Sequence, residues 1–140
     1  MKKLKFKIEI NAPKEKVWET LWNEPSYKQW TAIFSEGSYA EGDWNEGSKM
    51  KFLSANGEGM YSVIEKKLTN KQMTIKHLGE IKNGEEKDSE WSGAIENYIL
   101  TEKDGSTELK AEMDSTEEYV QYFEGTFPKV LEKIKQLAEN

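Results

Sequence analysis

The chain has 140 residues, of which 36% are hydrophobic, 33% charged and 11% aromatic, and it carries a formal net charge of -6 and no cysteine. The lack of cysteine excludes a disulfide framework, a thiolate nucleophile and a Cys-ligated metal, and the acidic balance disfavours nucleic acid as the main partner, because phosphate binding needs a basic face. The length fits one domain, residues 1–140, and the aromatic residues spread along it argue against disorder.

The first residues, MKKLKFKIEI, predict a strand and not an export signal. Lysines interrupt the apolar residues, so the apolar region of a signal peptide is missing. No stretch approaches the roughly 18 apolar residues of a membrane span. The sequence therefore predicts a soluble cytoplasmic protein without a membrane span.

Apolar and charged residues alternate from Leu4 to Ile10. A period of two indicates a strand with one buried face and one solvated face. Asn11 or Ala12 is expected to cap the helix that follows, with Pro13 in its first turn. After a second break at 23–25, another short helix is expected to carry the apolar residues Tyr27, Trp30, Ile33 and Phe34.

The middle of the chain predicts an antiparallel meander. Glycines punctuate it, and each is expected at a turn or bulge. Strands are expected near 38–44, 48–54, 59–68, 72–78, 91–101 and 107–113. The polar run 82–90 is expected to be a solvated loop, and Asp104-Gly105 is a strong signal for the turn of the last hairpin.

The last segment predicts a long helix. Ser115 or Thr116 can cap it, and Glu118 stands three residues after Ser115, as in a capping box. Its apolar residues recur every three or four positions and are Val120, Phe123, Phe127, Val130, Leu131, Ile134 and Leu137. Gly125 and Pro128 interrupt this pattern, so a kink or break is expected near 125–128.

These elements predict an α+β fold. An antiparallel sheet of six or seven strands has one apolar face to cover, and only the C-terminal helix is long enough to cover it. A strongly curved sheet around one helix does not close tightly along its whole length. A cavity is therefore expected between the sheet and this helix.

Residues 10–21, INAPKEKVWETL, resemble the opening I-x-A-P-x-x-x-V-W-x-x-L of the START-like superfamily, which is also described as Bet v 1-like, helix-grip or SRPBCC. Trp30 at the end of the second short helix resembles a further family position. So do GDWNEG at 42–47 and the helix pattern at 130–135. Within the superfamily, the chain is similar to bacterial proteins that resemble the activator of Hsp90 ATPase.

The resemblance implies a helix-grip fold, in which a curved antiparallel sheet of about seven strands wraps around the long C-terminal helix and two short helices follow the first strand. It also implies a hydrophobic cavity between the sheet and that helix. Family members include lipid carriers, hormone receptors, polyketide cyclases and proteins of unknown role. The resemblance therefore specifies the fold better than the function.

His77 is the only histidine, and it shares one face of its strand with Met73 and Ile75. An inward imidazole could act as a general base or a pocket donor, whereas a histidine bonded to a carbonyl or to water is the plainer alternative. No Ser or Asp around it forms a recognisable nucleophilic constellation, and one histidine is a poor start for a zinc site. No catalytic residue, metal or cofactor is predicted.

Glu96 is the second polar candidate. It shares a strand face with Tyr98 and Leu100, and an inward carboxylate could orient the polar head group of a ligand. The opposite face, with Trp91 and Ile95, is apolar as well. Periodicity therefore leaves the direction of Glu96 open.

Aromatic side chains make the best case for a binding site, because ligand pockets are mostly apolar and aromatic with a few polar groups. The alternative is that the rings only pack the core. The proposed fold gathers Trp30, Phe34, Tyr39, Trp44, Phe52, Tyr61, Trp91, Tyr98, Tyr119, Phe123 and Phe127 around one space. All of these except Tyr39 and Trp44, together with His77 and Glu96, are the candidate ligand-binding residues.

Three functions remain open. The first is a binding module for a small hydrophobic or amphipathic, lipid-like molecule, and it is preferred over an enzyme. The second is a protein-interaction module similar to the Hsp90 activator. An exposed apolar patch without a cavity would favour this function. The third is an enzyme, such as a polyketide cyclase or hydrolase. A convergent polar pair inside the cavity would favour this function.

Overall fold

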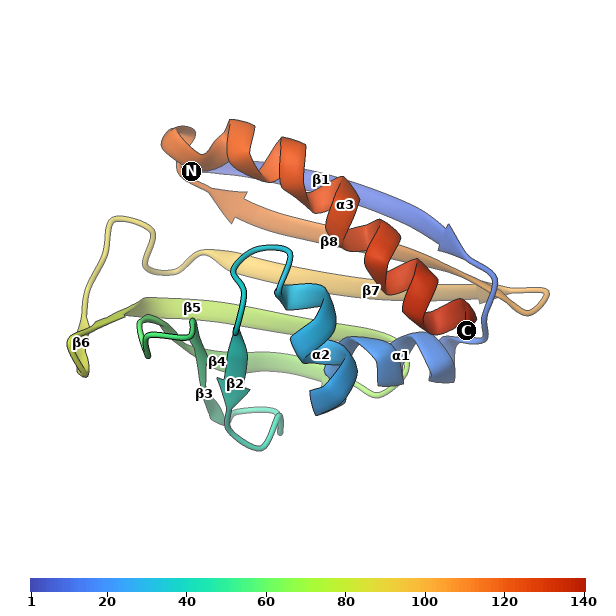
Figure 1. Cartoon of the computed structure of the whole chain (residues 1–140), viewed down its shortest axis with the longest axis horizontal. Coiled ribbons are helices and arrows are strands. Elements are labelled where there is room, and N and C mark those ends of the chain that lie inside the picture. Colours follow the sequence, from blue (N-terminus) through green and yellow to red (C-terminus); the bar gives the residue numbers. More distant parts are fainter.

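The computed structural model describes residues 1–140 and consists of one antiparallel sheet with a long helix crossing one face and two short helices at one end (Figure 1). The strands lie in the order β1-β8-β7-β5-β4-β3-β2, and β6 pairs only with β5. The predicted α+β helix-grip fold is thereby confirmed, with β6 as an addition to the seven strands of the main path. No helix is both long enough and apolar enough to cross a membrane.

The elements have the following bounds. The strands are β1 Lys2–Ile10, β2 Tyr39–Glu41, β3 Lys49–Leu53, β4 Gly59–Leu68, β5 Gln72–Lys82, β6 Glu85–Lys87, β7 Ile95–Lys103 and β8 Ser106–Ser115. The helices are α1 Lys14–Trp22, α2 Glu24–Thr31 and α3 Val120–Glu139, with a 3-10 turn, η1, at Glu117–Tyr119.

The alternating residues at the start of the chain form the strand β1 as predicted, and this strand is one edge of the sheet. Leu4 and Ile10 are buried against α3, while the lysines point to the solvated face. There Lys3 lies 3.3 Å from Asp114 of β8, its partner in the antiparallel register. Exposed pairs of this kind contribute little to stability, but they fit the register that burial imposes.

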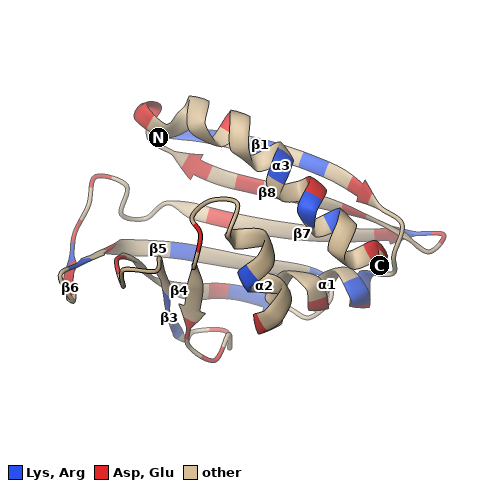
Figure 2. Ribbon diagram, in the orientation of Figure 1, with Lys and Arg blue, Asp and Glu red and all other residues tan.

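The helix α3 packs on the sheet through one apolar stripe. Val130, Leu131 and Ile134 are buried, and the buried ring of Phe127 stacks on Phe6 of β1 with centroids 4.9 Å apart. Lysines and acidic residues occupy the face of α3 that is turned away from the sheet (Figure 2). The predicted apolar stripe is thus the surface through which α3 packs on the sheet.

The predicted break in the last helix is wrong, because α3 runs without interruption from Val120 to Glu139 with Pro128 inside it. A proline removes one amide donor from the helix. Buried side chains on both sides, Phe127 and Val130, hold the backbone against the sheet. Tertiary packing therefore outweighs the local preference of the proline.

Three other local predictions also differ from the structure. Pro13, and not Asn11 or Ala12, occupies the N-cap position of α1, and it makes no side-chain hydrogen bond there. Ile33 and Phe34 follow α2 and are not part of it. The capping box does not form, because Ser115 belongs to β8 and bonds its hydroxyl to the carbonyl of Thr116. Pairing of β8 with β1 therefore delays the start of the helix.

The middle strands lie where they were predicted, with shifted ends. The strand β4 has the predicted bounds, β5 continues to Lys82, and the supposed loop 82–90 contains the short strand β6. The strand β7 begins at Ile95 and not at Trp91, because residues 91–94 form a turn in which Gly93 has a φ of 94°. Glycine adopts this left-handed conformation without strain.

We expect Gly125→Ala to stabilise the protein by about 0.5–1 kcal/mol, because Gly125 is exposed in α3 and alanine loses less backbone entropy in a helix. A Cβ atom there meets no other atom within 4 Å. Urea unfolding followed by circular dichroism measures the change. Gly59→Ala is the contrasting control: its Cβ would lie 1.9 Å from the carbonyl oxygen of Phe52, so it should destabilise. Loss of stability in the Gly125 variant would contradict the expectation.

Candidate functional site

A pocket of about 660 Å³ lies between the N-terminal part of α3, the helix α2 and the sheet. It is lined by 26 residues, of which 15 are hydrophobic. Ten of the lining side chains are aromatic: Trp22, Tyr27, Trp30, Phe34, Tyr39, Phe52, Trp91, Tyr119, Tyr122 and Phe123. Small-molecule sites are commonly concave, aromatic and of this order of size, about 300–1,000 Å³.

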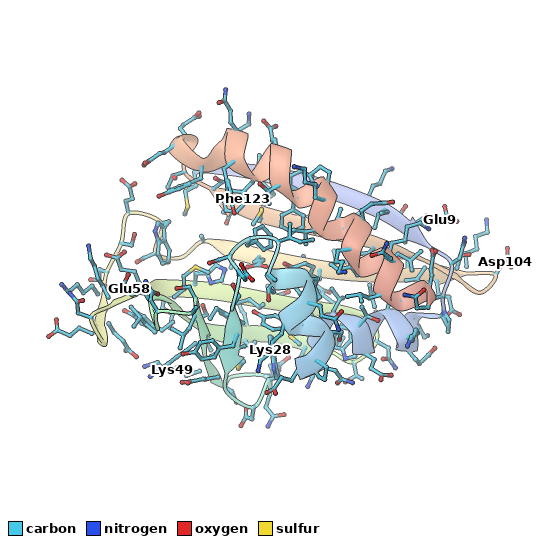
Figure 3. The ribbon with its side chains drawn as sticks, viewed as in Figure 1. Glu9, Lys28, Lys49, Glu58, Asp104 and Phe123 are labelled. Carbon is cyan, nitrogen blue, oxygen red and sulfur yellow. The ribbon has the colours of Figure 1, made fainter.

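The edge of the pocket is formed by the start of the last helix. Phe123 extends from α3 toward the sheet (Figure 3). The Tyr122 hydroxyl donates a hydrogen bond to the carbonyl of Phe34 at 3.2 Å and so joins α3 to the segment after α2. Tyr119 and Tyr122 are 48% and 44% exposed. Exposed tyrosines that also line a pocket mark its rim.

Four polar side chains are joined by hydrogen bonds at one corner of this pocket, and we call them the Glu96 corner: His77 and Glu96, which line the pocket, and Ser62 and Tyr98, which lie behind them. The Ser62 hydroxyl lies 2.7 Å from Nδ1 of His77, and Nε2 of His77 lies 2.9 Å from Oε1 of Glu96. The Tyr98 hydroxyl donates to Oε2 of Glu96. Ser62, His77 and Tyr98 are buried, whereas the side chain of Glu96 is 20% exposed.

Strand pairing brings the Glu96 corner together. Ser62 of β4 stands opposite His77 of β5, next to a shift in register after Tyr61. Ile75 of β5 stands opposite Glu96 of β7. Since side chains alternate along a strand, His77 and Glu96 point to the same face. The structure thus answers the question that periodicity left open: Glu96 shares the covered face with the buried Tyr98.

Burial and hydrogen bonding have opposite effects on the pKa of Glu96. Burial raises the pKa of Glu96, but the hydrogen bond from His77, the electrostatic attraction of His77 and the bond from Tyr98 outweigh it, so the pKa lies below its usual range. Burial, and next the negative charge of Glu96, raise the pKa of Tyr98 and of Tyr27. The corner therefore holds an ionised carboxylate bonded to the neutral phenol of Tyr98, and the phenol of Tyr27 is neutral as well.

The arrangement is not a nucleophilic triad. Ser62 is completely buried and does not line the pocket, so its hydroxyl is closed to a substrate. Both ring nitrogens of His77 are already within hydrogen-bond distance of Ser62 and Glu96. Within the Glu96 corner, the group that faces the pocket with spare hydrogen-bonding capacity is the carboxylate of Glu96.

Eight of the eleven candidate residues line the pocket: Trp30, Phe34, Phe52, His77, Trp91, Glu96, Tyr119 and Phe123. The other three do not. Tyr98 lies behind Glu96, the ring of Phe127 is buried between Phe6 and Phe34, and the ring of Tyr61 carries the ammonium of Lys49 at 5.2 Å from its centroid. The role of all eleven candidate residues in ligand binding is a prediction. For Tyr61, Tyr98 and Phe127 that role is an indirect one, because these side chains do not line the pocket.

Sequence reasoning missed Trp22, Tyr27, Ser62 and Tyr122. Tyr27 was predicted only as an apolar residue of the second short helix, and Trp22 ends the short helix before it. Ser62 had no signal, because its contact with His77 depends on a register shift. Tyr122 lies on the polar side of the helical pattern and contributes through its hydroxyl.

A family model described as "Activator of Hsp90 ATPase homolog 1-like protein" matches residues 11–139 of this chain. The chain belongs to this family. The resemblance seen in the sequence is confirmed by that match, which covers nearly the whole helix-grip domain. No curated protein sequence matches the chain.

Solved structures share the family's fold. DynU16, a protein in the dynemicin biosynthetic locus, has a TM-score of 0.75 at 12% identity, and the match covers 99% of this chain but 47% of DynU16. The Aha1 dimer from Colwellia psychrerythraea has a TM-score of 0.74 at 19% identity, covering 99% and 97% of the two chains. MLL2253 from Mesorhizobium loti has a TM-score of 0.73 at 15% identity, and the match covers 97% of this chain and 96% of MLL2253. At these identities the likeness concerns the fold alone.

Proposed function

We propose that this protein binds a small amphipathic molecule in the pocket between α2, α3 and the sheet. The observation that carries the proposal is the composition of the pocket wall, which combines ten aromatic side chains with polar groups that include the Glu96 corner. An apolar wall with a few convergent polar groups is the usual design of a ligand site, because the polar groups fix orientation.

The pocket has the capacity for useful affinity. Each buried CH₂ group contributes about 0.8 kcal/mol. A ligand that buries about ten such groups gains roughly 8 kcal/mol before the costs of association, and micromolar binding corresponds to about -8 kcal/mol. Apolar burial and one or two hydrogen bonds to the Glu96 corner together suffice for micromolar affinity.

Native mass spectrometry of the freshly purified protein, followed by titration with amphipathic compounds under Trp fluorescence, tests the proposal. We expect Phe123→Ala to weaken binding about 10-fold, because it removes one aromatic wall of the pocket. Leu68→Ala is the matched control, since Leu68 is 43% exposed at the end of β4 and does not line the pocket. A protein that carries no co-purified mass and responds to none of the compounds would refute the proposal.

A protein-interaction role is a second candidate, supported by membership of the Hsp90-activator-like family and by the exposed rim residues Tyr119 and Tyr122. Aromatic side chains are enriched at protein interfaces. The two roles separate by experiment. Tyr119→Ala should reduce capture of a protein partner more than it reduces binding of a small ligand, because Tyr119 lies at the exposed rim of the pocket.

Acid–base catalysis receives support from the polar pair of His77 and Glu96 inside the pocket. The engagement of both ring nitrogens of His77 favours binding over proton transfer by this histidine. Unchanged mass of a bound ligand after prolonged incubation supports binding alone, whereas a new product mass supports catalysis.

A further inference from the structure

The charge of the pocket wall restricts the ligand more than its apolar character does. The lining contains the carboxylates of Glu58, Glu96 and Asp114 and no lysine, although the chain is rich in lysine. Asp114 is already paired with Lys3, at 3.3 Å. The pocket lining therefore offers no lysine to the head group of a fatty acid or another anion, and its three carboxylates outnumber its one histidine.

The Glu96 carboxylate has free acceptor positions on the pocket side. Two oxygens offer about four lone-pair sites, and His77 and Tyr98 use one on each oxygen. Although burial raises the pKa of Glu96, the bonds from His77 and Tyr98 hold it below its usual range. The carboxylate thus keeps its charge and remains available for a donor from the ligand.

A second polar side chain lines the same pocket. Tyr27 lines the pocket and is 8% exposed, yet its hydroxyl has no hydrogen-bond partner in the protein. The charge of Glu96 reaches it and adds to the burial that raises the pKa of Tyr27. The Tyr27 oxygen can accept from the same ligand group that Glu96 binds.

Aromatic faces complete the surroundings. The rings of Phe52 and Trp91 lie edge-on to His77, with centroids at 6.1 Å and 6.5 Å from the imidazole, and both line the pocket. A cation near Glu96 is attracted by the faces of such rings. A carboxylate, a free phenol and aromatic rings together form an environment for an alkylammonium group.

We infer that the pocket selects amphipathic amines, which have an aromatic or aliphatic body and a protonated nitrogen, over neutral and anionic molecules of the same shape. The body lies among the rings of α2, β3 and α3. The ammonium group donates to Glu96 and to the Tyr27 oxygen. This inference rests on the proposed function and names its ligand class.

Isothermal titration with phenylbutylamine, phenylbutanol and phenylbutanoate tests the selectivity, because the three probes share one skeleton and differ in charge. The amine is expected to bind about 10-fold or more tighter than the alcohol, as hydrogen bonds to charged groups contribute about twice as much as neutral ones. The carboxylate is expected to bind most weakly. Equal binding of all three, or preference for the carboxylate, overturns the inference and leaves the pocket proposal standing. No binding of any probe overturns both.

Glu96→Gln locates the selectivity. It should reduce the preference for amine over alcohol by about 10-fold while the alcohol affinity stays within about 2-fold. Glu65→Gln is the matched control: Glu65 is exposed on β4, does not line the pocket and should leave all three affinities unchanged. An amine preference that survives in Glu96→Gln overturns the assignment.

A measurement on the unmodified protein covers the case in which Glu96→Gln does not fold. His77 is the only histidine, so its ring gives a single set of NMR resonances. Binding of phenylbutylamine at Glu96 should shift these resonances more than binding of phenylbutanol, because His77 bonds directly to that carboxylate. Saturable amine binding without such a shift contradicts the proposal.

Discussion

Phe127→Ala is expected to destabilise the protein by about 3–5 kcal/mol, the usual cost of removing a buried phenylalanine ring. The ring of Phe127 is 1% exposed. It stacks on Phe6 with an angle of 9° between the planes and meets the edge of Phe34 at 5.6 Å. One side chain thereby fixes α3 to the edge strand β1 and to the segment after α2.

The expected loss is a large part of the total stability, since domains of this size unfold at about 5–15 kcal/mol. Thermal unfolding should show a fall in Tm of roughly 10–20 °C. Tyr119→Ala, which removes an aromatic ring that is 48% exposed, should change stability by about 1 kcal/mol or less. A loss in Phe127→Ala as small as in this control would mean that α3 is not held by the ring stack.

The same residues explain why the fold was predictable from the sequence. The strand β1 and the helix α3 each have one buried face and one solvated face, so their residues follow a clear period of two or of three to four. Phe6 and Phe127 both fall on the apolar side of these patterns. An element with one buried face and one solvated face has a periodic pattern of apolar residues, and this pattern can be recognised in the sequence.

The Glu96 corner was only partly predictable. His77 and Glu96 were candidates as isolated polar residues on apolar strands, but β7 has apolar residues on both faces and thus no decisive period. The contact between Ser62 and His77 requires a register shift after Tyr61 that has no local sequence signal. Contacts that depend on pairing between strands are properties of the assembled sheet, and a single strand does not carry them.

Packing also explains the wrong prediction for the last helix. Local rules place a break at Pro128, yet the helix continues because its apolar stripe is held on the sheet before and after the proline. The same rules favoured a capping box at Ser115, which β8 uses for pairing with Lys2 of β1. In both places a long-range contact competes with a local preference and prevails.

His77→Ala is the second change with a large expected effect, and it should destabilise the protein by roughly 3 kcal/mol at neutral pH. The substitution leaves the Ser62 hydroxyl without its partner and Glu96 with only the bond from Tyr98. The Glu96 side chain is only 20% exposed, so solvent compensates little. Chemical unfolding in urea measures the loss.

The loss should depend on pH in a defined direction. In the native protein the pKa of Glu96 is below its usual range, so its ionised form adds stability above the unfolded pKa, and this contribution disappears as the pH falls through the lowered value. Without His77, burial dominates and the pKa of Glu96 is expected to rise above the unfolded value. Glu96 then destabilises at neutral pH and less so in acid, where it takes up a proton. The deficit of His77→Ala should therefore shrink toward about pH 4.

Two comparisons separate this coupling from a general loss of packing. The double substitution of His77→Ala with Glu96→Gln should cost less than the sum of the single changes, because glutamine leaves no buried charge behind. Lys28→Ala breaks the exposed Lys28–Glu24 pair and should cost about 0.5 kcal/mol or less. If the deficit of His77→Ala were instead the same at every pH and additive with Glu96→Gln, the imidazole would be a space-filling side chain. The carboxylate would then have to be held ionised by Tyr98 alone, and the amine selectivity of the pocket would have to survive the loss of His77.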